Sequence, residues 1–144
     1  MTAPAADKVE ELRALGWKQR ELLGFAERFG PLWTLKEERG WAYGVLAEDE
    51  HLNPDGAVHG GALTSLLDHA LSAIAWELIG RRPCVTVQLD AQFLNAAATG
   101  DFLVARGQLI QATGSLAFMR GTVSVHDKPI LNGSAVMKVL GARK

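Results

Sequence analysis

The chain has 144 residues, of which 48% are hydrophobic and 22% are charged, and this composition is typical of one soluble globular domain. Fifteen lysines and arginines face sixteen aspartates and glutamates, so there is no excess positive charge for non-specific nucleic-acid binding. The one cysteine, Cys84, cannot form an internal disulfide, and we expect it to be a small, unreactive apolar side chain in a reducing compartment.

Neither a secretory signal nor a membrane-spanning segment is expected. The stretch MTAPAADKVEEL at the start contains no apolar core of the kind that signal peptides have. The most apolar run, residues 57–79, carries Asp68, His69 and Glu77, and ionisable groups are costly inside a bilayer. These features predict a cytoplasmic protein that does not act at a membrane.

The N-terminal part of the chain favours helices. Asp7 is a candidate N-cap, with Glu10 as its capping-box partner, for a first helix that ends at Gly16. Apolar residues at helical spacing predict a second helix over about 18–29, which the following Gly-Pro pair ends. We therefore expect residues 1–30 to form an N-terminal helical extension on the surface of a main domain spanning 31–144.

From residue 32 onward the pattern changes to that of a sheet with one long helix. Alternating residues predict a hairpin over 32–47, and a turn-rich acidic loop follows at 48–56. Continuous apolarity over 58–79 predicts a long helix buried on all sides. Four later segments read as strands: 85–94, 102–112, 116–126 and 130–140. The predicted class is α+β, with the helix packed on an antiparallel sheet.

The start of this helix is a candidate oxyanion site. Gly60 and Gly61 stand at its N-terminus, where the first N–H groups lack partners inside the helix and the helix dipole is positive. Glycine lets a ligand approach these groups closely, so a carbonyl that develops negative charge could bind there. Close packing of the helix on the sheet explains the two glycines equally well.

A second candidate feature is a carboxylate within the apolar helix. Thr64, Ser65, Asp68 and Ser72 share one helix face, and no Lys or Arg lies within one turn of Asp68. An unpaired carboxylate in apolar surroundings suits a general base or a nucleophile. The structural alternative is an aspartate whose oxygens accept hydrogen bonds from the hydroxyls of Ser65 and Ser72.

The spacing of these two features predicts a dimer. Gly60 and Asp68 are eight residues apart, which is roughly 12 Å along a helix. One reacting carbon cannot lie within about 3 Å of both. If both act on one substrate, two antiparallel helices must bring Gly60 of one chain beside Asp68 of the other. We therefore expect a homodimer with two sites at its interface.

At these residues the chain resembles a known family. The pattern Asn-x5-His-Gly-Gly-x6-Asp, from Asn53 through His59 to Asp68, followed by the strand 85–90, is similar to that of hotdog-fold acyl-CoA thioesterases of the PaaI-like, phenylacetate-pathway group. Phe93-Leu94 and Gly100-Asp101 continue the similarity, which covers about residues 40–140. The resemblance implies a hotdog fold, in which an antiparallel sheet wraps round one central helix, and dimers that pair into tetramers.

The resemblance also implies roles for individual residues. The backbone N–H of Gly60 would polarise the thioester carbonyl, and Asp68 of the facing subunit would act as general base or nucleophile. Asn53 would help to hold the carbonyl or the water, and Thr86 would lie near the attacking water. His59 is expected to brace the glycine turn instead of transferring protons.

Beside these residues, Gly61 and Ser65 are expected to contact the substrate, an acyl-CoA, and His69 is expected to have a packing role. No metal or cofactor is expected, and neither a serine nucleophile elbow nor a Cys–His pair is present in the sequence. Two alternatives remain on the same fold. One is a non-catalytic acyl-CoA-binding, ligand-sensing protein, and the other is a hydratase or dehydratase.

Overall fold

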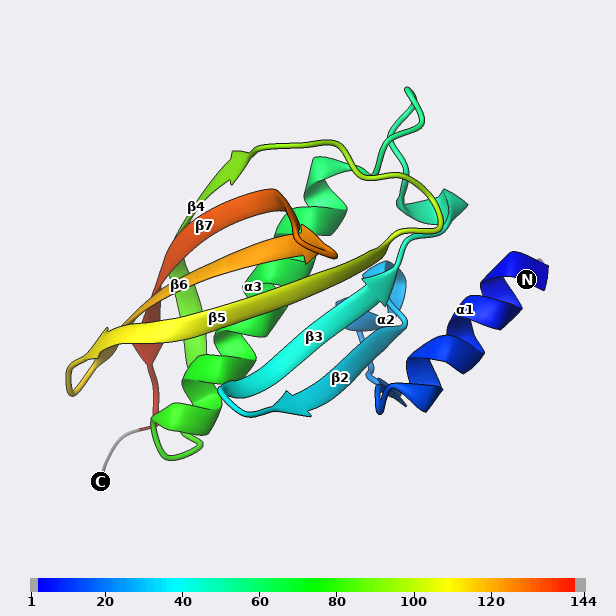
Figure 1. Ribbon diagram of the computed structural model, residues 1–144. Coiled ribbons are helices and arrows are strands. Elements are labelled where there is room, and N and C mark those ends of the chain that lie inside the picture. Colours follow the sequence, from blue (N-terminus) through cyan, green and yellow to red (C-terminus); the bar gives the residue numbers. More distant parts are fainter. Residues whose placement is uncertain (1–2, 142–144) are drawn as a thin grey trace.

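The computed structural model describes residues 3–141 and has the predicted α+β architecture (Figure 1). One antiparallel sheet has the strand order β1-β2-β3-β5-β6-β7-β4, and the long helix α3 crosses one face of it. The helices are α1 (Ala3–Ala14), α2 (Phe25–Phe29) and α3 (Gly60–Leu78), with a 3-10 turn, η1 (Asp49–His51). The strands are β1 (Lys18–Arg20), β2 (Leu32–Glu37), β3 (Gly40–Leu46), β4 (Cys84–Phe93), β5 (Phe102–Ala112), β6 (Leu116–Val125) and β7 (Lys128–Val139).

The N-terminal segment departs from the prediction in two ways. Helix α1 begins at Ala3, so Asp7 lies inside the helix and is not its N-cap. The expected helix over 18–29 is wrong in its first part, because Lys18–Arg20 form strand β1 and only α2 is helical. Strand β1 pairs with the edge of β2, and Arg20 Nε donates to Thr34 Oγ1 at 2.8 Å. Pairing to an available sheet edge outweighs local helix propensity here.

Helix α1 packs on the face of the sheet opposite α3. Leu12, Trp17, Trp33 and Ala42 form a small buried cluster there. Residues of β2 and β3 alternate between this cluster and the main core, as the pleat of a strand requires. The ring of Trp17 meets Phe102 edge to face, with centroids 4.8 Å apart. Helix α1 and Trp17 therefore cover the outer face of the β2–β3–β5 end of the sheet, whereas α2 lies on the side of α3.

A row of three glycines brings α3 close to the sheet. Gly107 pairs with Gly121, and Gly121 pairs with Gly133, across β5, β6 and β7. A Cβ atom at Gly107 would lie 2.5 Å from Leu71 Cδ2, and one at Gly133 would lie 2.7 Å from Leu67 Cδ2. No other residue type leaves room for these leucines, so the row fixes where α3 lies on the sheet.

Only one face of α3 is buried. Its buried residues are Leu63, Leu66, Leu67, Ala70, Leu71, Ile74 and Ala75. On the opposite face, Ser65, Asp68 and Ser72 are half-buried, and Trp76 is 40% exposed. The prediction of a helix buried on all sides is therefore wrong for a single chain, in which the sheet covers only one side of α3.

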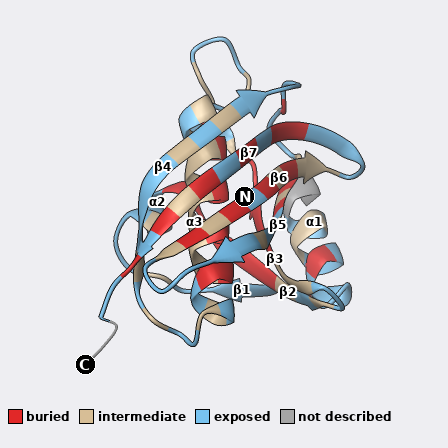
Figure 2. Ribbon diagram, turned by 90° about the vertical axis from the view of Figure 1, so that its left-hand side faces the viewer, coloured by how far each residue is buried: buried red, intermediate tan, exposed pale blue. Residues whose placement is uncertain are grey.

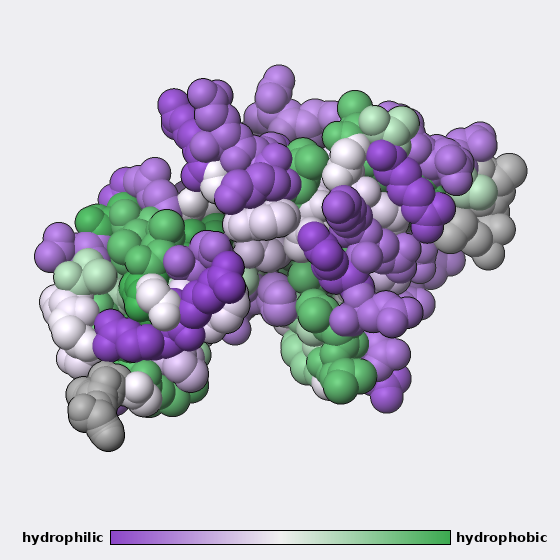
Figure 3. Space-filling model, turned by 90° about the horizontal axis from the view of Figure 1, so that it is seen from below, coloured by the Kyte–Doolittle hydropathy of each residue, from purple (hydrophilic) through white to green (hydrophobic). Residues whose placement is uncertain are grey.

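Strand β4 forms an open edge of the sheet. It is hydrogen-bonded to β7 on one side only, and most of its residues are exposed, whereas β6 and β7 alternate between buried and less buried residues (Figure 2). Val85, Val87 and Phe93 are about half exposed or more, at 49%, 60% and 56%. The view from below shows separate apolar patches on the surface, with a hollow between them (Figure 3). Among residues 3–141, no helix is long and apolar enough to cross a membrane.

Candidate active site

The N-terminus of α3 is capped by the side chain of the preceding histidine. His59 Nδ1 accepts a hydrogen bond from Gly61 N at 2.7 Å. Because this nitrogen is an acceptor, the proton of the neutral ring is on Nε2. A Cβ atom at Gly61 would lie 3.0 Å from Nδ1, so the glycine leaves space for the cap. The His59 side chain therefore holds the start of α3 through this one hydrogen bond.

The N–H of Gly60 is available to a ligand. Within residues 3–141 this N–H has no hydrogen-bond partner, and it lies at the positive end of a 19-residue helix. A Cβ atom at Gly60 would lie 3.2 Å from Cε1 of Phe93, the last residue of β4. No pattern in the sequence predicts this contact, because it depends on where β4 ends beside the helix.

Asn53 organises the loop that leads to this helix. Its Oδ1 accepts from Asp55 N at 2.9 Å and from Ala57 N at 3.1 Å. The backbone closes the same turn, since Asn53 N donates to Ala57 O at 2.7 Å. In the described part of the chain the amide Nδ2 has no acceptor, so it is free to donate to a ligand. The loop and the start of α3 therefore present at least two N–H donors.

The carboxylate of Asp68 is hydrogen-bonded to strand β4. Thr86 Oγ1 donates to Asp68 Oδ1 at 2.6 Å, while Met137 Sδ lies 3.4 Å from the same hydroxyl. The single hydroxyl proton goes to the carboxylate, the closer and charged acceptor. The structural alternative is wrong, because Ser65 Oγ donates to Gly61 O and Ser72 Oγ points to Met137.

A β-bulge directs Thr86 toward α3. The register between β4 and β7 shifts between Thr86 and Gln88, so Val87 is an extra residue. Beyond the bulge, Leu89 and Ala91 pack on the core, three and five residues after Thr86. In a strand without a bulge, residues three or five positions apart face opposite sides, and the bulge at Val87 places Thr86 on the same side as these two.

The titratable neighbours of Asp68 are held neutral. Burial raises the pKa of the Cys84 thiol, and the charge of Asp68 raises it further, so the thiol stays protonated and is a poor nucleophile. Burial lowers the pKa of His69, although the charge of Asp68 opposes this effect. The structure therefore offers Asp68 as the one charged group here, with two uncharged neighbours.

His69 belongs to an aromatic cluster on the α2 side of the helix. Its ring contacts Phe29 and Tyr43 edge to face, with centroids 6.0 and 6.1 Å away. Burial, together with the charge of Glu77, raises the pKa of Tyr43 to about 12. These contacts give His69 the expected packing role.

The predicted residues form two groups that one chain does not bring together. Asn53, His59, Gly60 and Gly61 lie at the start of α3, whereas Asp68 lies eight residues along it, roughly 12 Å away by helical rise. Ser65 lies between the groups, and its hydroxyl donates to Gly61 O at 2.7 Å. Within one chain these residues therefore form two separate groups along α3.

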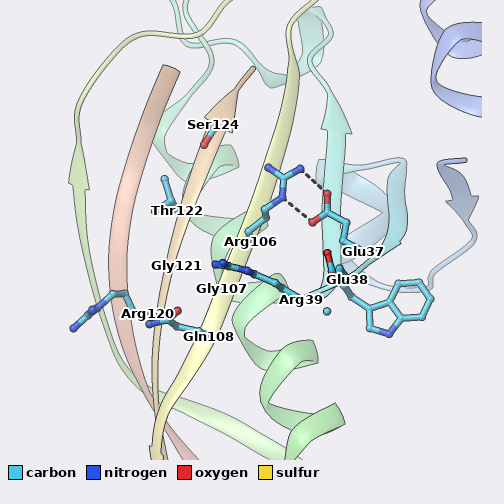
Figure 4. A pocket seen from close by; sticks show the side chains of 12 residues that line it. Glu37, Glu38, Arg39, Arg106, Gly107, Gln108, Arg120, Gly121, Thr122 and Ser124 are labelled. Carbon is cyan, nitrogen blue, oxygen red and sulfur yellow. Dashed lines mark hydrogen bonds and ion pairs between the residues drawn. The ribbon is translucent and has the colours of Figure 1, made fainter. Parts of the chain in front are cut away.

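A hollow lies away from these residues, on the outer face of the sheet (Figure 4). It measures about 570 Å³ and is lined by polar residues of β2, β3, β5 and β6. Arg106 Nε and Nη2 each donate at 2.8 Å to an oxygen of Glu37. Arg106 also lowers the pKa of this carboxyl, so Glu37 is an ionised, occupied acceptor and not a base.

Comparison with known proteins gives the family. The model of the thioesterase superfamily matches residues 55–129, more than half of the chain. A curated relative from Pseudomonas aeruginosa, PA0474, whose name proposes an esterase activity, is 27% identical over 109 residues, which are 74% of this chain and 81% of that protein.

Solved structures of similar fold include zebra fish thioesterase superfamily member 2, with a TM-score of 0.75 at 22% identity over 92% of this chain and 96% of that one. BH2602 from Bacillus halodurans, solved with CoA, has a TM-score of 0.76 at 18% identity over 98% and 91%. The protein smu.793 from Streptococcus mutans, bound to acetyl CoA, has a TM-score of 0.64 at 24% identity over 72% and 82%. The family match, together with a sheet packed around one long helix, shows that this chain is a hotdog-fold member of the thioesterase superfamily.

Proposed function

We propose that the protein hydrolyses acyl-CoA thioesters at sites that two chains build together. The observation that carries this proposal is the placement of complementary half-sites on one helix. An unpartnered N–H at Gly60 suits a carbonyl oxygen, and the hydroxyl-bound carboxylate of Asp68 suits a water or a carbonyl carbon. Relatives of the same fold that bind CoA or acetyl CoA support the ligand class.

The open surfaces of the chain support a homodimer. Strand β4 has an unpaired edge, and residues 3–141 leave the side of α3 that carries Asp68 only partly covered. Exposed strand edges are sites for pairing with another chain. Two antiparallel α3 helices related by a two-fold axis would bring Gly60 of each chain beside Asp68 of the other. By resemblance to the family, we also propose that dimers pair into tetramers.

In this arrangement the reaction follows from the donors and the base. The thioester oxygen accepts from Gly60 N–H, with Asn53 Nδ2 as a second donor to the oxygen or to the water. Asp68 of the partner subunit takes the proton of a water that attacks the carbonyl carbon, or attacks that carbon itself. In either route the C–S bond breaks and the CoA sulfur leaves as a thiolate that takes up a proton. Where Asp68 is the nucleophile, a water then hydrolyses the acyl anhydride on Asp68, which frees the acid and restores the carboxylate. The Thr86 hydroxyl orients the carboxylate, while Gly61 and Ser65 lie beside the bound acyl group.

The first experiment measures thiol release from a panel of aromatic and aliphatic acyl-CoAs. Asp68→Asn should lower kcat by about 10²–10⁴-fold, the usual contribution of a general base, and keep acyl-CoA binding. Asp127→Asn, which removes the same charge from an exposed turn, is the matched control and should keep full activity. Binding without turnover in the wild-type protein would instead support the ligand-sensing alternative, and reversible hydration of an enoyl-CoA would support the hydratase.

A mixing experiment tests whether the site needs two chains. Gly60→Pro removes the N–H at the first helical position, where proline is tolerated, and Asp68→Asn removes the base. Each variant alone should be inactive. In a mixture unfolded and refolded together, half of the dimers contain both chains, and one of their two sites has Gly60 and Asp68 intact. About a quarter of wild-type activity should return, whereas a site within one chain would recover none.

A further inference from the structure

We propose that His51 is a positioning residue that holds the Gly60 N–H in place by tying the active-site loop to the N-terminal segment. The inference rests on the proposed function for its catalytic consequence. His51 is 4% exposed and, with Thr34, is one of two buried polar side chains in the described part of the chain. Its burial does not follow from a role in the reaction, because its ring contacts neither Asp68 nor Thr86 in the hydrogen-bond network.

Both ring nitrogens of His51 are used, and in opposite roles. Nδ1 accepts from the backbone N–H of Glu48 at 3.0 Å. Nε2 lies 3.1 Å from the backbone oxygen of Gly30, which can only accept. The ring is therefore the neutral tautomer with its proton on Nε2. An apolar side chain of the same size would leave a buried N–H and a buried carbonyl without partners.

The backbone of His51 continues this connection to the site. His51 O accepts from His59 N at 2.8 Å, and His59 is the N-cap that precedes Gly60. A β-bridge between Leu52 and Val58 closes the loop beside it. A displacement of the His51 ring is thus passed through one carbonyl to the residue next to the proposed oxyanion donor.

At the other end of this connection lies Gly30, whose backbone is closely packed. Gly30 directly follows α2, whose Phe29 is buried against His69. A Cβ atom at Gly30 would lie 2.8 Å from Leu32 N and 2.9 Å from Ala26 O, so this backbone is closely packed. The N-terminal segment therefore provides a fixed carbonyl against which the loop is set, a role that its sequence does not suggest.

The test compares His51→Phe, which removes both hydrogen bonds, with His51→Gln, which keeps a donor and an acceptor. Val123→Ala, in the sheet and fully buried, is a control for lost stability alone. We expect His51→Phe to lower kcat by about 10- to 100-fold, since small displacements of catalytic groups have effects of this size, with KM within about threefold of wild type. His51→Gln should have most of the wild-type kcat. Val123→Ala should have the wild-type kcat, even where its loss of Tm equals that of His51→Phe.

Amide hydrogen exchange provides a measurement that does not depend on turnover. The amides of His59 and Gly60 should exchange faster in His51→Phe than in Val123→Ala at matched stability. If kcat and these exchange rates change by the same amount in both variants at an equal loss of Tm, His51 has only a structural role and the proposal fails. A wild-type protein that hydrolyses no acyl-CoA would refute the proposed function, while the exchange rates would still decide the role of His51.

The histidine tautomer decides the proposal even if His51→Phe does not fold. Nitrogen NMR of the wild-type protein with labelled histidine should show His51 protonated on Nε2 and not on Nδ1 at neutral pH. The opposite tautomer, or a rapidly exchanging ring, is incompatible with the two hydrogen bonds and would overturn the proposal.

Discussion

The two sides of α3 differ in what surrounds them, and the difference separates stability from chemistry. On one side, Leu67 and Leu71 pack against glycines of the sheet with no space left over. On the other side, Asp68 and Thr86 form a short hydrogen bond at the molecular surface. Many buried residues hold the packed side of α3, so losing one of them should lower stability without moving the reactive side. Variants of the two sides should therefore change different measured quantities.

The largest effect is expected on the packed side. Leu71→Ala should lower the free energy of unfolding by about 3–5 kcal/mol, because Leu71 is fully buried and the glycines around it cannot fill the cavity. Urea unfolding at one fixed protein concentration measures this loss, since association shifts apparent stability. The kcat of the folded fraction should stay within about threefold of wild type. A loss of kcat like that of Asp68→Asn would show that the two sides are not separable.

A smaller effect is expected on the reactive side. Thr86→Val keeps the shape of the side chain but removes the hydroxyl that donates to Asp68, so kcat should fall about tenfold, or about 1.4 kcal/mol. Its free energy of unfolding should change by less than about 1 kcal/mol, because Thr86 is exposed. Thr86→Ser, the matched control, retains the hydroxyl and should retain kcat. Full activity in Thr86→Val would mean that Asp68 needs no such orientation.

The smallest effect is expected far from both sides, on the outer face of the sheet. Glu37→Gln breaks the ion pair with Arg106, whose side chains are 30% and 51% exposed, and should cost less than about 1 kcal/mol at pH 7. Arg106 lowers the pKa of Glu37 in the folded protein below its usual value of 4.5. The ion pair therefore stabilises the protein at any pH above 4.5. This contribution is lost as the pH falls through the lower, folded-state pKa.

Thermal unfolding of wild type and Glu37→Gln from pH 7 to pH 3 checks this sign. The two Tm curves should converge in acid, and kcat should be equal throughout the range in which both are folded. A Tm difference that grows as the pH falls would contradict the assignment.

Most of the fold could be predicted because its pattern is regular. The expected helix over 58–79 is Gly60–Leu78, and the four later strands lie within one or two residues of their predicted bounds. The prediction failed at Lys18–Arg20, which are all exposed and so have no alternation for a strand to show. Their pairing with β2 is a tertiary contact that no local pattern encodes.

Part of the site could also be predicted, because some of its residues follow a regular local pattern. The residues around Gly60 are neighbours in the chain, and helical spacing placed Asp68 on one face with Ser65 and Ser72, although that face was expected to be buried. The contact between Asp68 and Thr86 depends on the bulge at Val87, which reverses the alternation in the strand, and so only family resemblance pointed to it. His51 was not singled out because its partners, Gly30 and Glu48, meet it only in the folded chain.

The glycine row also constrains how this sequence can change over time. Gly107, Gly121 and Gly133 are neighbours in adjacent strands, so a methyl group gained at one cannot be accommodated by shrinking another. At Gly107 the nearest atom to such a methyl group is Leu71 Cδ2, so a smaller residue at position 71 can relieve the clash. At Gly121 and Gly133 backbone oxygens of Arg106 and Asp90 lie within 2.8 and 2.6 Å, and no side-chain change makes room. Among natural relatives, a substitution at Gly107 should therefore occur together with one at Leu71, while Gly121 and Gly133 should remain glycine.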